Sequence, residues 1–232
     1  MALKDNLKEI HQKISAAAKR CGRDENEITL ICVSKTIDAD TINEAFNLGE
    51  KVFGENRVQE LTEKYPLVNS DAHWHLIGHL QTNKVKYVVG KAELIHSVDS
   101  LHLAKAINAQ AEKQGICQKI LLEVNISGEE SKYGLTTEEI PTIIKEIGSL
   151  KGLSFKGFMT MAPLYAEEKE VRDIFSKAKK LFDEYKPYGS EVLSMGMSGD
   201  FEIAVEEGAT CVRVGRSIFK KQAEPAPMSR PN

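Results

Sequence analysis

Apolar residues fall in short runs that alternate along the chain with longer stretches in which they recur every three or four positions. The short runs have the character of strands buried in a parallel sheet, and they cover residues 28–36, 52–56, 73–79, 94–98, 119–125, 153–161, 191–194 and 211–214. The longer stretches predict helices, and they cover residues 3–20, 38–48, 57–65, 81–89, 100–114, 138–147, 167–185 and 201–207.

The alternation of strands and helices indicates the fold class. A strand, a helix and a second parallel strand form a right-handed crossover, and eight such units in 232 residues favour a closed barrel over an open doubly wound sheet. We therefore predict an α/β protein that is a single (β/α)8 TIM barrel over residues 1–221, with a helix before the first strand. Residues 222–232 are rich in proline and poor in apolar side chains, so we expect a disordered tail.

Composition excludes functional classes rather than selecting one. Hydrophobic residues make up 41% of the chain and charged residues 28%, which is ordinary for a soluble globular protein. A net charge of −3 gives no electrostatic reason to bind nucleic acid or an anionic membrane, and no stretch reaches the length of a membrane span. The four cysteines form no CxxC pair and no uninterrupted apolar segment opens the chain, so we expect buried thiols and a cytoplasmic location.

Lys35 ends the first apolar run and is the first residue with candidate chemistry. By the period of two along a strand it shares a face with Ile31 and Val33, so its ammonium group is predicted to lie beside apolar side chains. Burial of this kind lowers the pKa of a lysine and makes the neutral amine available to react with an aldehyde. The alternative is a lysine whose charged end merely reaches water beyond the strand.

Two glycine-containing loops come after the last two predicted strands, where barrels of this class often bind phosphate. The loop at residues 194–200 contains Ser198 and Gly199, and the loop at residues 215–219 begins with Gly215. Glycine lets the backbone approach an anion and a serine hydroxyl adds a donor. Each loop taken alone is equally typical of a turn.

Arg213 lies on the eighth predicted strand and shares a face with Cys211 and Gly215, which directs its guanidinium group toward the barrel interior. An inward arginine needs a partner, and the alternative is a buried ion pair with a carboxylate. An imine-forming lysine, an anion site and an inward arginine together indicate a pocket for a phosphorylated aldehyde. Pyridoxal 5′-phosphate is the common cofactor of that type.

Three histidines indicate a different possibility. His73 and His75 lie two apart on the third predicted strand and point the same way, and with His79 they could bind zinc as in metal-hydrolase barrels. No accompanying acidic ligand is evident at a strand end, and packed or surface histidines explain the spacing as well. We predict no metal site.

Seven segments of the chain resemble, in the same order, the motifs of the YggS/PROSC family of pyridoxal phosphate homeostasis proteins. They are residues 33–36 (VSKT), 53–60 (FGENRVQE), 75–84 (HLIGHLQTNK), 131–134 (SKYG), 157–159 (GFM), 194–198 (SMGMS) and 213–219 (RVGRSIF). The resemblance extends from the first predicted strand to the eighth. One departure is visible, because Lys220 and Lys221 come after Phe219 where the family usually continues with glycine.

The resemblance implies a fold-type III barrel like the N-terminal domain of alanine racemase, in which Lys35 holds pyridoxal 5′-phosphate as a Schiff base. It also implies that Arg213 faces the pyridine nitrogen and disfavours its protonation. The residues implied to hold the phosphate or to border the ring are Asn56, Ser198, Gly199, Gly215 and Arg216. Further residues expected near the site are Lys132, His79 and Met197.

Two functions are open to such a barrel. A racemase needs a base on each face of the substrate α-carbon, and alanine racemase takes the second from an additional C-terminal domain that we do not expect in this chain. We therefore expect a monomeric protein that carries or buffers pyridoxal 5′-phosphate, with apo-enzymes that use this cofactor as recipients. The alternative is a weak amino-acid racemase that uses Lys35 and another barrel group.

Overall fold

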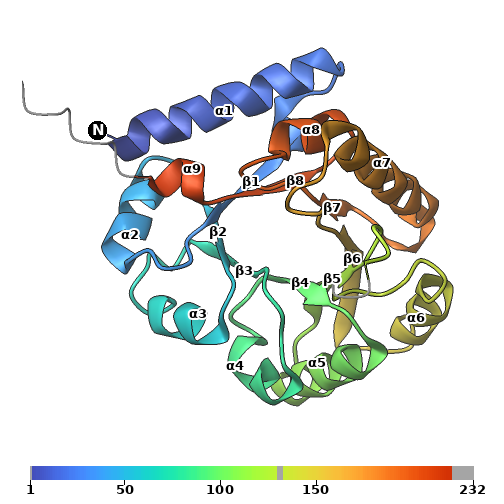
Figure 1. Cartoon of the computed structure of the whole chain (residues 1–232). Coiled ribbons are helices and arrows are strands. Elements are labelled where there is room, and N and C mark those ends of the chain that lie inside the picture. Colours follow the sequence, from blue (N-terminus) through green and yellow to red (C-terminus); the bar gives the residue numbers. More distant parts are fainter. Residues whose placement is uncertain (1, 130–132, 221–232) are drawn as a thin grey trace, which may run out of the picture.

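The structure, a computed structural model, describes residues 2–129 and 133–220, and the strands among them form a closed parallel barrel (Figure 1). The strands are β1 (Thr29–Val33), β2 (Val52–Glu55), β3 (His73–Leu76), β4 (Leu94–Val98), β5 (Gln118–Glu123), β6 (Leu153–Met159), β7 (Val192–Ser194) and β8 (Cys211–Val214). Each strand pairs with the next along the chain, and β8 closes on β1, where Ile31 and Arg213 are partners. The predicted (β/α)8 barrel is confirmed.

Helices surround the barrel and cover the outer side of its strands (Figure 1). They are α1 (Ala2–Arg20), α2 (Ala39–Asn47), α3 (Val58–Lys64), α4 (Val85–Val88), α5 (Leu101–Gln114), α6 (Ile140–Ile147), α7 (Glu168–Glu184), α8 (Phe201–Glu206) and α9 (Arg216–Phe219), with short 3-10 helices η1 (Glu25–Glu27), η2 (Thr82–Lys84) and η3 (Lys186–Tyr188). Asp38 is the N-cap of α2, because its side chain accepts a hydrogen bond from the Thr41 amide. Such a cap stabilises a helix by about 1 kcal/mol.

The predicted N-terminal helix, α1, lies across the side of the barrel where β8 meets β1, beside α8 and α9 (Figure 1). Its buried stripe includes Leu7, Ile10 and Ile14, which recur at helical spacing. Asn6, also buried, donates a hydrogen bond of 2.8 Å to the carbonyl of Ile218. This contact fixes α9, the helix that begins in the second predicted phosphate loop.

Four local predictions were wrong. The first strand ends at Val33 rather than at residue 36, because the chain turns there, and the third ends at Leu76 rather than at residue 79. The predicted helix over residues 81–89 is divided into η2 and the single turn of α4, a segment in which β-branched valines weaken helix propensity. Cys32 and Cys211 are buried as expected, but Cys21 and Cys117 are exposed because they lie at the ends of elements rather than inside them.

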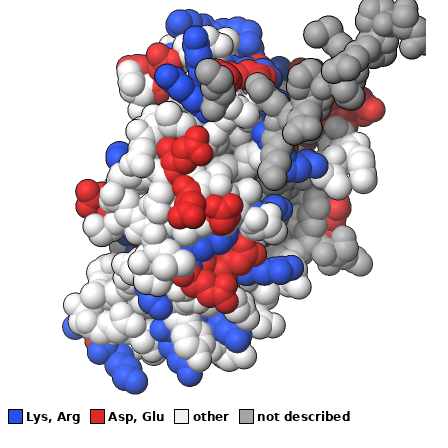
Figure 2. All heavy atoms as spheres, turned by 90° about the vertical axis from the view of Figure 1, so that its left-hand side faces the viewer, with Lys and Arg blue, Asp and Glu red and all other residues white. Residues whose placement is uncertain are grey.

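Acidic and basic side chains are interspersed on the side of the molecule that carries α2 (Figure 2). No helix within residues 2–129 and 133–220 combines the length and the apolar character that a bilayer span requires. The predicted tail at residues 222–232 lies outside the described residues.

Candidate functional site

A cleft of about 670 Å³ opens where β1, β2, β3, β6, β7 and β8 end. Small-molecule sites commonly have volumes of about 300 to 1,000 Å³. The predicted site residues that line this cleft are Lys35, Asn56, Met197, Ser198, Gly199, Arg213, Gly215 and Arg216. The barrel thus brings together side chains from four separate parts of the sequence at the end where TIM barrels hold their ligands.

Two residues expected near the site are not part of this cleft. His79 lies just beyond β3 and is exposed; its Nδ1 lies 3.2 Å from the Asp99 carboxylate and its ring stacks on Tyr133 at 4.3 Å between centroids. This places His79 at the mouth of β3 and β4, on another part of the rim. Lys132 lies outside the described residues.

Lys35 is exposed, so the prediction of a buried lysine was wrong. The strand stops two residues earlier and leads into a tight turn, in which the Ile37 amide donates a 2.9 Å hydrogen bond to the Ser34 carbonyl. Lys35 and Val33 both line the cleft, so the side chain still faces the predicted site. Thr36, the next residue in the turn, has a φ of 65°, which is a left-handed conformation that β-branched residues rarely adopt.

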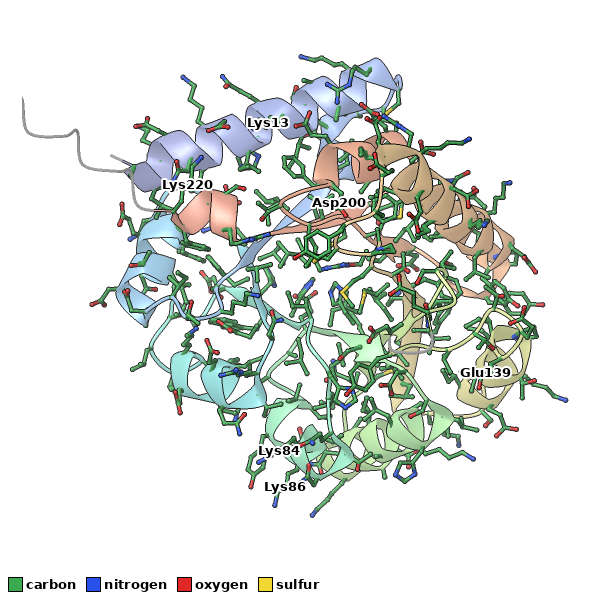
Figure 3. All side chains as sticks on the ribbon, viewed as in Figure 1. Lys13, Lys84, Lys86, Glu139, Asp200 and Lys220 are labelled. Atoms are coloured by element: carbon green, nitrogen blue, oxygen red, sulfur yellow. The ribbon has the colours of Figure 1, made fainter. Side chains whose placement is uncertain are left out.

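The two predicted phosphate loops are in contact. The Gly215 amide donates to the Ser198 hydroxyl at 3.4 Å, which joins the loop after β7 to the loop after β8. Asp200 accepts a 2.6 Å hydrogen bond from the Met197 amide, and burial raises the pKa of this carboxyl above its ordinary value. Figure 3 shows Asp200 at the start of α8 on the side toward the barrel.

Glycine at these loops leaves space that a side chain would fill or disrupt. A Cβ on Gly199 would meet no atom within 4 Å, so this position borders open space in the cleft. A Cβ on Gly215 would lie 2.9 Å from the Val33 carbonyl oxygen, so here glycine is needed for close packing of the two backbones. Gly199 therefore leaves room for a ligand in the cleft, and Gly215 allows the loop after β8 to pack closely against the end of β1.

Arg213 is 4% exposed, yet its hydrogen bonds do not go to a carboxylate. It donates to the Ser194 hydroxyl at 2.5 Å and to the Thr160 carbonyl at 3.0 Å. The alternative of a buried hydrogen-bonded ion pair is therefore not what the structure shows. Burial lowers the pKa of Arg213, but a guanidinium group stays charged in proteins, so a positive charge held by neutral acceptors borders the cleft.

A buried polar chain continues behind Arg213. Ser194 Oγ lies 3.0 Å from His96 Nδ1, and His96 Nε2 lies 3.0 Å from His75 Nδ1. Because arginine only donates, Ser194 Oγ accepts from Arg213, and a neutral His96 ring donates through one of its two nitrogens and accepts through the other. Burial lowers the pKa of His75 to about 4 and that of His96 well below its ordinary value, so both rings are neutral at pH 7.

The three histidines of the predicted zinc alternative have separate partners. His73 Nδ1 pairs with the Glu93 carboxylate at 2.6 Å, His75 bonds to His96, and His79 pairs with Asp99. No group of three or more His, Cys, Asp or Glu side chains is placed to hold a metal ion within the part of the chain that the structure describes.

Sequence reasoning missed one wall of the cleft. The loop between β6 and α7 contributes Met161, Ala162, Pro163, Leu164 and Ala166, a mostly apolar set. The signal was available, because Met161 ends a predicted strand and the other residues follow it, so that they must lie at the same end of the barrel as the phosphate loops.

Comparison with known proteins places the chain in a family. The family profile described as "Alanine racemase, N-terminal domain" matches residues 2–222. A "Pyridoxal phosphate homeostasis protein" of Aquifex aeolicus is 44% identical over 219 residues, which cover 93% of this chain and 96% of that protein.

Solved structures agree with this assignment. PipY from Synechococcus elongatus, with pyridoxal phosphate bound, is 34% identical and superposes with a TM-score of 0.78, covering 89% of this chain and 99% of that one. An alanine racemase from Clostridium difficile shares the fold at 16% identity, with a TM-score of 0.76 over 94% of this chain and 56% of its own. The chain therefore belongs to the family of pyridoxal phosphate homeostasis proteins, which have the fold of the alanine racemase N-terminal domain.

Proposed function

We propose that this protein binds pyridoxal 5′-phosphate in the cleft and carries or buffers it, with Lys35 as the residue that bonds covalently to the aldehyde carbon. The observation that carries the proposal is the convergence of Lys35, Asn56, Arg213 and the two glycine loops on one cleft. The Aquifex relative's name and the ligand of PipY support it.

The donor set of the cleft fits a phosphate monoester. Ser198 contributes a hydroxyl, Gly199 leaves its backbone open to an anion, and Arg216 is exposed with its positive charge at the rim. Asn56 Oδ1 is a buried oxygen without a hydrogen-bond partner among the described residues. Because an unpaired buried polar atom is costly, it marks a position where a polar group of the ligand would be accommodated.

The charge of Arg213 tunes what a bound cofactor can do. Pyridoxal phosphate supplies an electron sink when its ring nitrogen is protonated. We propose that Arg213 lies beside that nitrogen, where a fixed positive charge disfavours the added proton. The neutral partners Ser194 and Thr160 leave that charge uncompensated by a direct carboxylate bond. Such a site favours holding the cofactor over carbanion chemistry.

The groups around the cleft also favour a carrier over a racemase. A racemase needs two bases on opposite sides of one carbon. Among the described residues that line the cleft there is no tyrosine and no histidine. Its acidic members are engaged elsewhere, Asp200 by the Met197 amide and Glu168 by Arg172. Weak racemase activity is the second candidate function, since the fold is shared with alanine racemase.

A titration with pyridoxal 5′-phosphate tests the proposal. We expect the ligand-free protein to take up one equivalent and to develop a yellow absorbance band. Incubation of the loaded protein with L-amino acids in deuterated water should then give no sustained exchange at the α-carbon. A protein that retains no absorbance band after the excess cofactor has been removed would overturn the binding proposal, whereas exchange at enzymatic rates would replace the carrier with a racemase.

Apo-enzymes as recipients, a monomeric state and a cytoplasmic location stay predictions. Transfer is measured by mixing the loaded protein with an apo-enzyme that uses the cofactor and monitoring the recovery of its activity. We expect recovery faster than the release of the cofactor into buffer alone.

A further inference from the structure

The turn that carries Lys35 is held in an unusual conformation. It is closed by the bond from the Ile37 amide to the Ser34 carbonyl, with Lys35 and Thr36 in its two central positions. A φ of 65° at the second central position is normally taken by glycine, since it brings a side chain close to the backbone. A threonine in this place persists only when surrounding contacts enforce it.

Those contacts come from three side chains on β2 and α3. The Thr36 amide donates a 2.7 Å hydrogen bond to the Glu60 carboxylate, and the same carboxylate lies 3.0 Å from Lys64 Nζ. Lys64 Nζ also donates to the Ser34 carbonyl at 2.9 Å and to Glu55 at 2.8 Å. The residues immediately before and after Lys35 are therefore both fixed by the same ion-paired cluster.

The Ser34 side chain is held from the same direction. Its hydroxyl donates a 2.7 Å hydrogen bond to Glu55 Oε1, and Glu55 is fully buried. Burial raises the pKa of the Glu55 carboxyl, while Lys64 and Ser34 lower it. The second oxygen, Oε2, has no partner among the described residues.

Glu55, a buried carboxyl group with one unpaired oxygen, is not expected to add much to the stability of the fold. Desolvation of buried charges offsets most of the attraction between them, and such pairs are better attested as fixing one conformation than as adding free energy. The conformation fixed here is that of the turn on which Lys35 stands. Lys35 itself is exposed and extends from this turn into the cleft.

We propose that Glu60 and Lys64, backed by Glu55, are positioning residues that hold the turn at residues 34–37 so that the Lys35 amine faces the cleft before any ligand arrives. This inference rests on the proposed role of Lys35. Glu60 and Lys64 do not line the cleft, so they act through the backbone of Ser34 and Thr36. Loss of this positioning slows the capture of the cofactor, because a misplaced reacting group lowers the rate more than it lowers equilibrium binding.

The test compares Glu60→Ala and Glu60→Gln with Glu63→Ala, an exposed carboxylate on the same helix that takes no part in these contacts with the turn. In the ligand-free proteins, hydrogen exchange of the Thr36 amide should accelerate about tenfold in Glu60→Ala, since a charge-assisted hydrogen bond is lost. The rate of cofactor capture, measured by stopped-flow absorbance, should fall about tenfold. Glu60→Gln should recover part of both, because an amide oxygen still accepts from Thr36, and Glu63→Ala should match wild type.

The outcomes separate this inference from the proposed function. If wild type captures the cofactor and Glu60→Ala captures it at the same rate, the positioning role is overturned even if amide exchange is faster. If hydrogen exchange of the Thr36 amide is unchanged in Glu60→Ala, Glu60 does not hold the turn, and this result is independent of any ligand. If wild type fails to bind the cofactor, the proposed function fails, whatever Glu60 does to the turn.

Discussion

The mouth of the barrel has two unlike halves. The cleft half, at the ends of β1, β2, β6, β7 and β8 and bordered by Ile77 just after β3, is lined by glycine loops, an apolar loop and three cationic side chains. The histidine half, at β3, β4 and β5, holds two bonded pairs, His75 with His96 and His79 with Asp99, and the buried carboxyl group of Glu123. Equivalent ends of eight similar strands thus hold either open space for a ligand or a packed polar network.

The difference between the halves arises from the segments that leave the strands. Gly199 after β7 borders open space, and the turn after β1 projects Lys35 away from the core. In the histidine half, His75 and His96 point inward and satisfy each other. Because a buried polar group needs a partner, that half can form without a ligand, whereas Asn56 in the cleft half leaves an oxygen unpaired.

The largest expected effect is the loss of covalent binding on Lys35→Ala. With the amine removed, no covalent bond between residue 35 and the aldehyde carbon can form, and the protein should show no yellow band once free pyridoxal 5′-phosphate has been removed. Lys86→Ala is the matched control, since Lys86 lies on α4 on the outside of the histidine half (Figure 3). A yellow Lys35→Ala protein would contradict the assignment.

Two glycine substitutions in the cleft half should have different effects, one on cofactor affinity and the other on the free energy of unfolding. Gly199→Ala places a methyl group in open space, so we expect unfolding free energy within about 0.5 kcal/mol of wild type and cofactor affinity lower by about tenfold. Gly215→Ala forces a methyl group against the Val33 carbonyl and should cost about 1 to 3 kcal/mol. Urea unfolding and cofactor titration on both variants check this, and equal stabilities would count against the packing role of Gly215.

Buried titratable groups of the histidine half should make the free energy of unfolding depend on pH. Burial, with the charge of Asp99, raises the pKa of Glu123 from 4.5 to about 7. Between these values the folded state holds a proton that the unfolded state has released, so this group lowers the free energy of unfolding as pH rises, by about 3 kcal/mol in total. His75 acts in the opposite sense, because its pKa is about 4 when folded and 6.5 when exposed.

Glu123→Gln removes one of these opposed contributions. We expect the free energy of unfolding of this variant to rise more steeply with pH than that of wild type over the window set by Glu123, pH 4.5 to 7. Urea unfolding at several pH values measures it, with Glu63→Gln as an exposed control. Parallel curves for Glu123→Gln and wild type would show that Glu123 is not protonated in the folded protein.

The smallest effect is expected at His79. Its pair with Asp99 is partly exposed, with 39% of the His79 side chain accessible, and such pairs contribute about 0.5 kcal/mol. Because His79 lies outside the cleft, His79→Gln should change cofactor affinity by less than about threefold. A loss of cofactor affinity as large as that of Gly199→Ala would place His79 in the binding site and would contradict the division of the barrel mouth into two halves.

The fold was predictable because its signals are local. Apolar runs, helical stripes and the Asp38 cap each lie within one segment, and their order alone specifies the barrel. The gathering of Lys35, Arg213 and the glycine loops was expected from the rule that barrel sites lie at the ends of strands.

The rest depends on contacts between distant residues. Thr36 gives no sequence signal of a left-handed turn, since a β-branched residue argues against one. Its partner Glu60 is 24 residues away, and the bond between His96 and Ser194 spans 98 residues. Period-two reasoning placed Lys35 on the correct side but inside the core, because no pattern showed where the strand would stop.

The most direct test of the central claim is reduction of the cofactor-loaded protein with borohydride and subsequent peptide mapping. Reduction makes the bond between the amine and the aldehyde carbon permanent, so the modified residue is identified directly. We predict a single modified peptide, the one that contains Lys35. Modification of a different lysine, or no modification of a protein that has taken up the cofactor, would contradict the account.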